Sequence, residues 1–153
     1  MERGHLIRTA ALVALTLGLA SSAGAAGTWR VLADGASQGP GVAKTTGYLA
    51  LDRAAAGKFS ARIPAAGVSK LAHVDYAANA VVAIFGEFGC KDGRVTVTSV
   101  AQHGTTLAVR LVEKPPAPGT VECMAIFGTY RLLAVPRQLL ERPYPTRVAV
   151  SGA

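Results

Sequence analysis

The sequence predicts a mainly β fold: a small antiparallel meander, sandwich-like or open-barrel-like, with one short helix in its N-terminal half. A near-continuous apolar run at residues 80–88 is typical of a strand that is buried on both faces. Residues 95–98 alternate apolar and polar side chains, which is typical of a half-buried strand, and Leu107, Val109 and Leu111 form one face of a further strand. The connections between these segments are short and contain no crossover helix, so neighbouring strands are expected to run antiparallel.

The first 25 residues have the three parts of a secretory signal peptide. Arg3 and Arg8 precede an apolar run at residues 9–20, and residues 23–25 (AGA) form an A-x-A cleavage pattern. The run is shorter than the roughly 20 residues that span a bilayer, although a retained N-terminal anchor is the alternative interpretation. We therefore expect an exported, soluble mature chain without a transmembrane segment, in the periplasm or outside the cell.

The N-terminal half of the mature chain contains weak signals for two strands and one helix. Residues 28–32, which include the single tryptophan of the chain, and the apolar residues 48–51 predict two short strands. Residues 52–61 predict one or two helical turns, because Asp52 is a typical N-cap residue and alanines follow it. Pro64 is expected to end this helix.

The signals become clearer after residue 74. Residues 89–93 (GCKDG) follow the first apolar run and predict a hairpin turn. The alternation that begins at residues 95–98 loses its phase at Ser99 and Val100, which indicates a β-bulge. Residues 103–104 are expected to turn the chain again.

Three more strands are expected before the C-terminal tail. In residues 107–112 the odd-numbered positions form one apolar face. Residues 115–119 (PPAPG) predict a loop, because proline cannot continue a strand ladder. Residues 120–127 and 130–135 predict two further strands, and residues 141–153 are expected to run along the surface or to fray.

Composition is consistent with one domain at residues 26–140, followed by the tail. The chain of 153 residues has a formal charge of +7, and the expected cleavage leaves 14 basic and 8 acidic residues, a charge of +6. This charge favours anionic partners such as envelope lipids or polyanionic glycans. The basic residues are scattered singly, without the clustering that a nucleic-acid interface needs, so no nucleic-acid partner is expected.

Cys90 and Cys123 are the two cysteines of the chain. In an oxidising compartment such a pair predicts a disulfide. The bond would close a loop of 34 residues and stabilise the fold by about 4 kcal/mol. A metal site that also uses His73 and His103 is the alternative, but its spacing fits no zinc pattern. No metal or cofactor is expected.

The sequence predicts no catalytic site. Ser69, His73 and Asp75 lie close in sequence, but a nucleophilic serine needs a separate exposed turn, and no G-x-S-x-G motif is present. Glu87 and Asp92 are better explained as an exposed strand residue and a turn residue. We therefore expect a protein that is not an enzyme, and a small hydrolase around His73 is the alternative.

Segments of the second half resemble a known family. Residues 73–76 (HVDY) and 81–87 (VVAIFGE) are similar to a V-D-[FY] element and the apolar strand with a G-[DE]-like step that follows it. That combination belongs to the C-terminal domain of PrcB-like protease-complex subunits. The family's glycine-bearing hairpin and V-x-V strand are matched by Gly93 and residues 95–97.

The resemblance covers residues 74–136 in the expected order, since the family's next strand, proline-containing loop and closing strand have counterparts here. Two positions differ: the turn reads FGCKDGR where the family more often has a T-G-G-Y-like turn, and residues 127–130 (FGTY) lack the family's proline. The resemblance implies an exported, non-catalytic β-domain that associates with or supports an envelope protease.

The expected function is that of an interaction or accessory module whose partner is another envelope or secreted protein, with a protease as one candidate. A protease-inhibitor-like role and binding of envelope polyanions remain open alternatives. Two loops are expected to contact the partner. Their contact residues are Phe88, Gly89, Lys91, Asp92, Gly93, Arg94, Pro115, Pro116 and Pro118.

Overall fold

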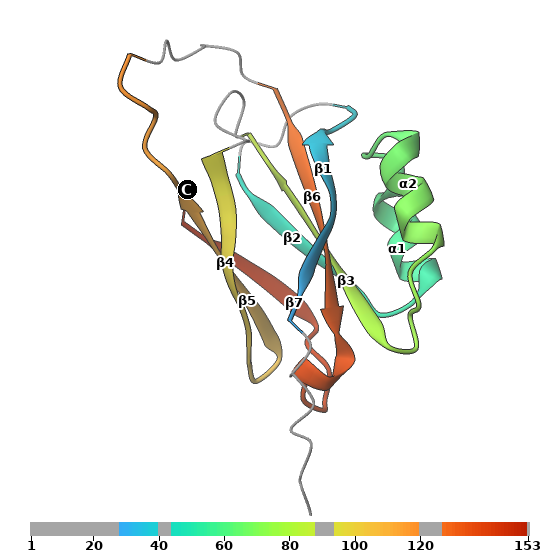
Figure 1. Cartoon of the computed structure of the whole chain (residues 1–153). Coiled ribbons are helices and arrows are strands. Elements are labelled where there is room, and N and C mark those ends of the chain that lie inside the picture. The colour runs from blue at the N-terminus through green and yellow to red at the C-terminus, as the bar shows by residue number, and fades with distance from the viewer. Residues whose placement is uncertain (1–27, 40–43, 88–93, 120–126, 153) are drawn as a thin grey trace, which may run out of the picture.

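A computed structural model describes residues 28–39, 44–87, 94–119 and 127–152. In these residues seven strands form one sheet that curls into a half-barrel, and two helices lie side by side against one of its faces (Figure 1). The elements in chain order are β1 (Arg30–Ala36), β2 (Thr46–Ala50), α1 (Arg53–Ser60), α2 (Ala65–Ala72), β3 (Asn79–Gly86), β4 (Val95–His103), β5 (Thr106–Glu113), β6 (Thr129–Pro136), the 3-10 turn η2 (Arg137–Leu139) and β7 (Arg147–Ser151).

The mainly β class is confirmed, but the strands do not follow one another as in a meander. Their order across the sheet is β1-β6-β3-β2-β7-β5-β4. Of the expected hairpins, β4–β5 is present and turns at Gly104, whose φ is +58°. The expected hairpin between β3 and β4 is wrong, because β3 pairs with β2 and β6 instead. Residues 80–85 are buried on both faces, so this strand takes a central position with a neighbour on each side.

The C-terminal segment does not fray as expected. Its residues Arg147–Ser151 form β7, which lies between β2 and β5 and runs parallel to β5. Val148 and Val150 alternate with more exposed residues and pack against the core. The strand was missed in the sequence because prolines precede this short period-2 pattern. Pairing with β2 on one side and β5 on the other holds the segment inside the sheet.

The helix predicted at residues 52–61 is present as α1, and the carboxylate of Asp52 accepts a hydrogen bond from the Ala55 N–H at 2.7 Å, as an N-cap does. A second helix, α2, was not expected. The expectation that Pro64 ends the first helix is wrong, because α1 already stops at Ser60 with Ala61 as its C-cap. Pro64 is instead the N-cap of α2, where its missing N–H costs nothing. His73 is the C-cap of α2 and is exposed, and it does not enter a strand.

The hydrophobic core has two layers, one on each face of the sheet. The inner core, in the curl of the half-barrel, consists of Ala80, Val82, Ile84, Val95, Leu107, Val109, Leu111, Leu133, Val135 and Leu140. The helix-side core, under α1 and α2, consists of Ala50, Ala56, Phe59, Ile63, Leu71, Val81, Ala83, Phe85, Tyr130 and Leu132. Alternate residues of β3 belong to the two layers, which explains its continuous apolar run.

Both edge strands contain an irregularity. The bulge predicted at Ser99 is present as a register shift between Val97 and Ser99 in β4. A second shift lies between Val31 and Ala33 in β1. Bulges of this kind twist an edge strand and limit how far another strand can pair with it.

Candidate functional site

The two edges of the described sheet, β1 and β4, line the same cleft. Its volume is about 320 Å³, and it lies where the curl of the half-barrel remains open. Residues of β1, β4 and β6 form its walls together with the segment before β1. They are Trp29, Val31, Asp34, Val95, Thr96, Val97 and Arg131. The cleft is therefore bordered on two sides by strands that each have one neighbour among the described residues.

The main chain of β4 directs hydrogen-bonding groups into this cleft. The Lys114 N–H donates to the Arg94 carbonyl at 3.0 Å, which identifies that pair as a hydrogen-bonded pair of the β4–β5 ladder. Because such pairs alternate along antiparallel strands, Val95 and Val97 point their N–H and C=O groups away from β5. Both valines line the cleft.

The same alternation applies to β1. The Ser37 N–H donates to the Gly128 carbonyl at 2.8 Å, next to the Ala36–Thr129 pair of the β1–β6 ladder. Counting back through the ladder, Asp34 and Val31 point their main-chain groups away from β6. Each of the two edge strands therefore has two cleft residues whose main-chain N–H and C=O groups point away from the neighbouring strand of the sheet. They are Val31 and Asp34 on β1, and Val95 and Val97 on β4.

The side chains of the cleft combine an apolar wall with a charged base. Trp29 packs partly against the inner core, and Val31 is 46% exposed. Arg131 is 5% exposed, and its Nε lies 3.8 Å from Oδ2 of Asp34. The base of the cleft is therefore formed by a buried guanidinium that lies beside a half-exposed carboxylate.

The predicted partner loops are only partly within the described residues. Phe88, Gly89, Lys91, Asp92 and Gly93 lie outside them, and so do both cysteines of the predicted disulfide and residues 120–126 of the predicted strand.

The described loop residues flank the β4–β5 pair at one end. Arg94 directly precedes β4, and its guanidinium donates to Oε1 of Glu113 at 3.1 Å. Pro115, Pro116 and Pro118 follow β5 and are exposed. Since Val95 pairs with Glu113 and the Lys114 N–H bonds to the Arg94 carbonyl, Arg94 and the start of the proline-rich loop lie side by side next to the cleft residue Val95.

The residues considered for catalysis have structural roles. Nδ1 of His73 lies 2.7 Å from the Ser69 carbonyl oxygen, and Oδ1 of Asp75 accepts from the Ala77 N–H at 2.9 Å. His103 is exposed at the β4–β5 turn. Within the described ranges, no group of three or more His, Cys, Asp or Glu side chains is arranged to hold a metal ion.

The cleft was not predicted from the sequence. The one available signal is Arg131, a charged residue inside the otherwise apolar segment at residues 130–135. A buried charge of this kind indicates partner groups nearby, but the sequence does not say that Asp34 is one of them.

Comparison with protein-family models, with curated proteins and with solved structures finds no match to this chain. No family is therefore assigned, and the resemblance to PrcB-like subunits stays a prediction. Separately, none of the helices in the described part of the chain is long and apolar enough to cross a membrane.

Proposed function

We propose that this protein is a non-catalytic interaction module that binds a short extended segment of a partner protein as an added strand in the cleft between β1 and β4. The observation that carries the proposal is that both sheet edges direct main-chain groups into one cleft. Strand addition uses such groups for affinity and the neighbouring side-chain pockets for specificity.

The geometry of the sheet defines how the segment would bind. Following the pairing across the sheet, β1 and β4 run in opposite directions. A strand between them would be antiparallel to one edge and parallel to the other. The bulge after Val97 interrupts the regular edge of β4, so a short bound segment is expected.

The side chains define which segment would fit. Trp29, Val31 and Val95 offer an apolar wall for alternate residues of the bound strand, and the half-exposed Asp34 offers a carboxylate at the base of the cleft. We therefore infer a segment with small or medium apolar residues at every second position and a basic or polar residue near Asp34. An envelope or secreted protein, with a protease as one candidate, is the partner class proposed from the sequence.

The experiment begins with a displayed library of random peptides selected on the purified mature chain. The affinity of the selected peptides is then measured for the parent chain, Val97→Pro and the matched control Val100→Pro. Both valines pack partly against the inner core, and both lie opposite residues of β5 that do not bond to β4. Only Val97 lines the cleft, so its proline variant removes a cleft donor without removing a ladder bond.

Binding to Val97→Pro is expected to weaken by about tenfold or more, because a main-chain hydrogen bond is lost and the ring blocks the edge. Binding to Val100→Pro should change by less than about twofold, since that position lies outside the cleft. Amide hydrogen exchange at Val95 and Val97 should slow when the peptide binds. Equal affinity for both variants, or unchanged exchange at these amides, would contradict strand addition. Binding only of polyanions, with a steep salt dependence, would favour the electrostatic alternative.

A further inference from the structure

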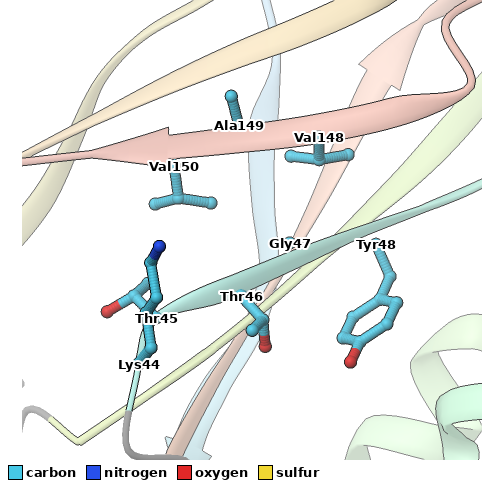
Figure 2. Close-up of a pocket in the computed structure, with 8 residues that line it drawn as sticks. All are labelled: Lys44, Thr45, Thr46, Gly47, Tyr48, Val148, Ala149 and Val150. Carbon is cyan, nitrogen blue, oxygen red and sulfur yellow. The ribbon is translucent and has the colours of Figure 1, made fainter.

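A second cavity lies at the corner where β2 and β7 cross, and it shares no lining residue with the cleft. Its volume is about 440 Å³. Figure 2 shows that it opens between the two strands, with the side chains of Val148 and Val150 directed toward β2 and Ala149 directed away. The lining residues are Lys44, Thr45, Thr46, Gly47, Tyr48, Val148, Ala149 and Val150.

The cavity exists because the two strands share a single pair, Gly47 with Val148. A Cβ on Gly47 would lie 2.5 Å from Cγ1 of Val148, so glycine allows β7 to cross β2 closely at this point. The neighbouring rung, which would join Thr45 and Val150, is not part of the strand register.

The groups of the missing rung face the cavity. The Arg137 N–H donates to the Ala78 carbonyl at 2.9 Å, which sets the alternation across β6, β3 and β2. With this alternation Gly47 and Thr45 direct their main-chain groups toward β7, and Val148 and Val150 direct theirs toward β2. The cavity therefore offers N–H donors and C=O acceptors from both strands.

The charge of the cavity favours an anion. Lys44 supplies the one charged side chain among the described lining residues, and none of them is acidic. Figure 2 shows its ammonium group extended toward β7, on the same side as Val150. Thr45 adds a hydroxyl donor beside it. The net charge of +7 further favours a negatively charged ligand.

We propose that this corner cavity binds the C-terminal end of a peptide. The terminal carboxylate pairs with the Lys44 ammonium and the Thr45 hydroxyl, and the last side chain contacts Val148 and Val150. The amide that precedes the carboxylate occupies the missing rung, where its N–H and C=O pair with main-chain groups of Thr45 and Val150. A simple carboxylate lacks this amide, so it cannot donate a hydrogen bond to a main-chain carbonyl of the missing rung.

The test is a titration of the mature chain followed by NMR, with three small probes. N-acetyl-L-valine has the amide and the carboxylate, N-acetyl-L-valine amide lacks the charge, and pentanoate lacks the amide. N-acetyl-L-valine is expected to shift the amide signals of Thr45, Gly47 and Val150. Each of the other two probes should bind about tenfold or more weakly, since each lacks one set of hydrogen bonds.

Variants separate the charge of Lys44 from a general effect of surface charge. Lys44→Met should weaken binding of N-acetyl-L-valine by about tenfold. Lys44→Arg keeps the positive charge and should bind this probe as the parent chain does. Lys58→Met, on the exposed surface of α1, should leave binding of the probe unchanged. Equal binding of pentanoate would overturn the peptide assignment, and equal loss in both methionine variants would overturn the role of Lys44. Val97→Pro should not alter this binding, so failure here is distinguishable from failure of the strand-addition proposal.

Discussion

The ring of Tyr130 on β6 lies against Gly67 on α2, where a Cβ would be 3.0 Å from the tyrosine hydroxyl oxygen. This contact joins the sheet to α2. Burial raises the pKa of Tyr130 above its ordinary value of 10.0, and the charge of Asp34 raises it further.

The first prediction concerns alkaline pH. The folded chain holds the Tyr130 proton more tightly than the unfolded chain, so the free energy of unfolding should fall as the pH rises above about 10. Tyr130→Phe removes this contribution and should show a shallower decline. Urea denaturation of both proteins between pH 8 and pH 11 measures this decline. The difference between their free energies of unfolding at pH 8 is the baseline. An identical decline in both proteins would contradict the assignment.

The second prediction concerns the crossing of β2 and β7. Gly47→Ala places a methyl group within 3 Å of three side-chain atoms of Val148 and Val150. We expect it to lower the free energy of unfolding by about 2 kcal/mol, since overpacking forces the strands apart. Gly57→Ala is the matched control, because a Cβ there meets no atom within 4 Å. It should stabilise α1 by about 0.5–1 kcal/mol. Urea denaturation of both variants measures the change in the free energy of unfolding, which should be negative for Gly47→Ala and positive for Gly57→Ala.

The third prediction concerns the C-terminal strand. A chain that ends at Thr146 lacks β7, which pairs with β2 on one side and β5 on the other. The β4–β5 hairpin then loses its sheet neighbour, and the inner core loses Val148 and Val150. We expect loss of cooperative thermal unfolding. A chain that ends at Ser151 keeps β7 and should unfold cooperatively. Equal melting temperatures for the two chains would show that β7 is dispensable.

The fourth prediction concerns the cysteine pair, which lies outside the described residues. If Cys90 and Cys123 form the predicted disulfide, alkylation without reductant should leave the intact mass unchanged. Reduction before alkylation should add two alkyl groups and lower the free energy of unfolding by about 4 kcal/mol. Two alkylated thiols in freshly secreted, unreduced protein would contradict the bond.

Local signals predicted most of the individual elements. Asp52 indicated the start of α1, and the broken alternation at Ser99 indicated the bulge in β4. The helix α2 was missed because its eight residues include Gly67 and follow a proline. Its stability comes from packing Leu71 into the helix-side core, which no pattern within the segment reveals.

The sites depend on relationships that local patterns do not contain. Asp34 and Arg131 are almost 100 residues apart in sequence, and they meet because β1 pairs with β6. Gly47 and Val148 meet because the C-terminal strand enters the sheet beside β2. Neither contact could be predicted without the strand order.

By itself, the sequence determined the mainly β class, the position of α1, the β4–β5 hairpin and the strand that is buried on both faces. These features follow from hydrophobic periodicity and turn residues, which act over a few neighbouring positions. Only the tertiary structure decided which strands are neighbours, where the sheet stays open and which residues line the cleft and the corner cavity. Strand partners are chosen by burying the apolar faces of the whole chain together, so this choice depends on residues far apart in sequence.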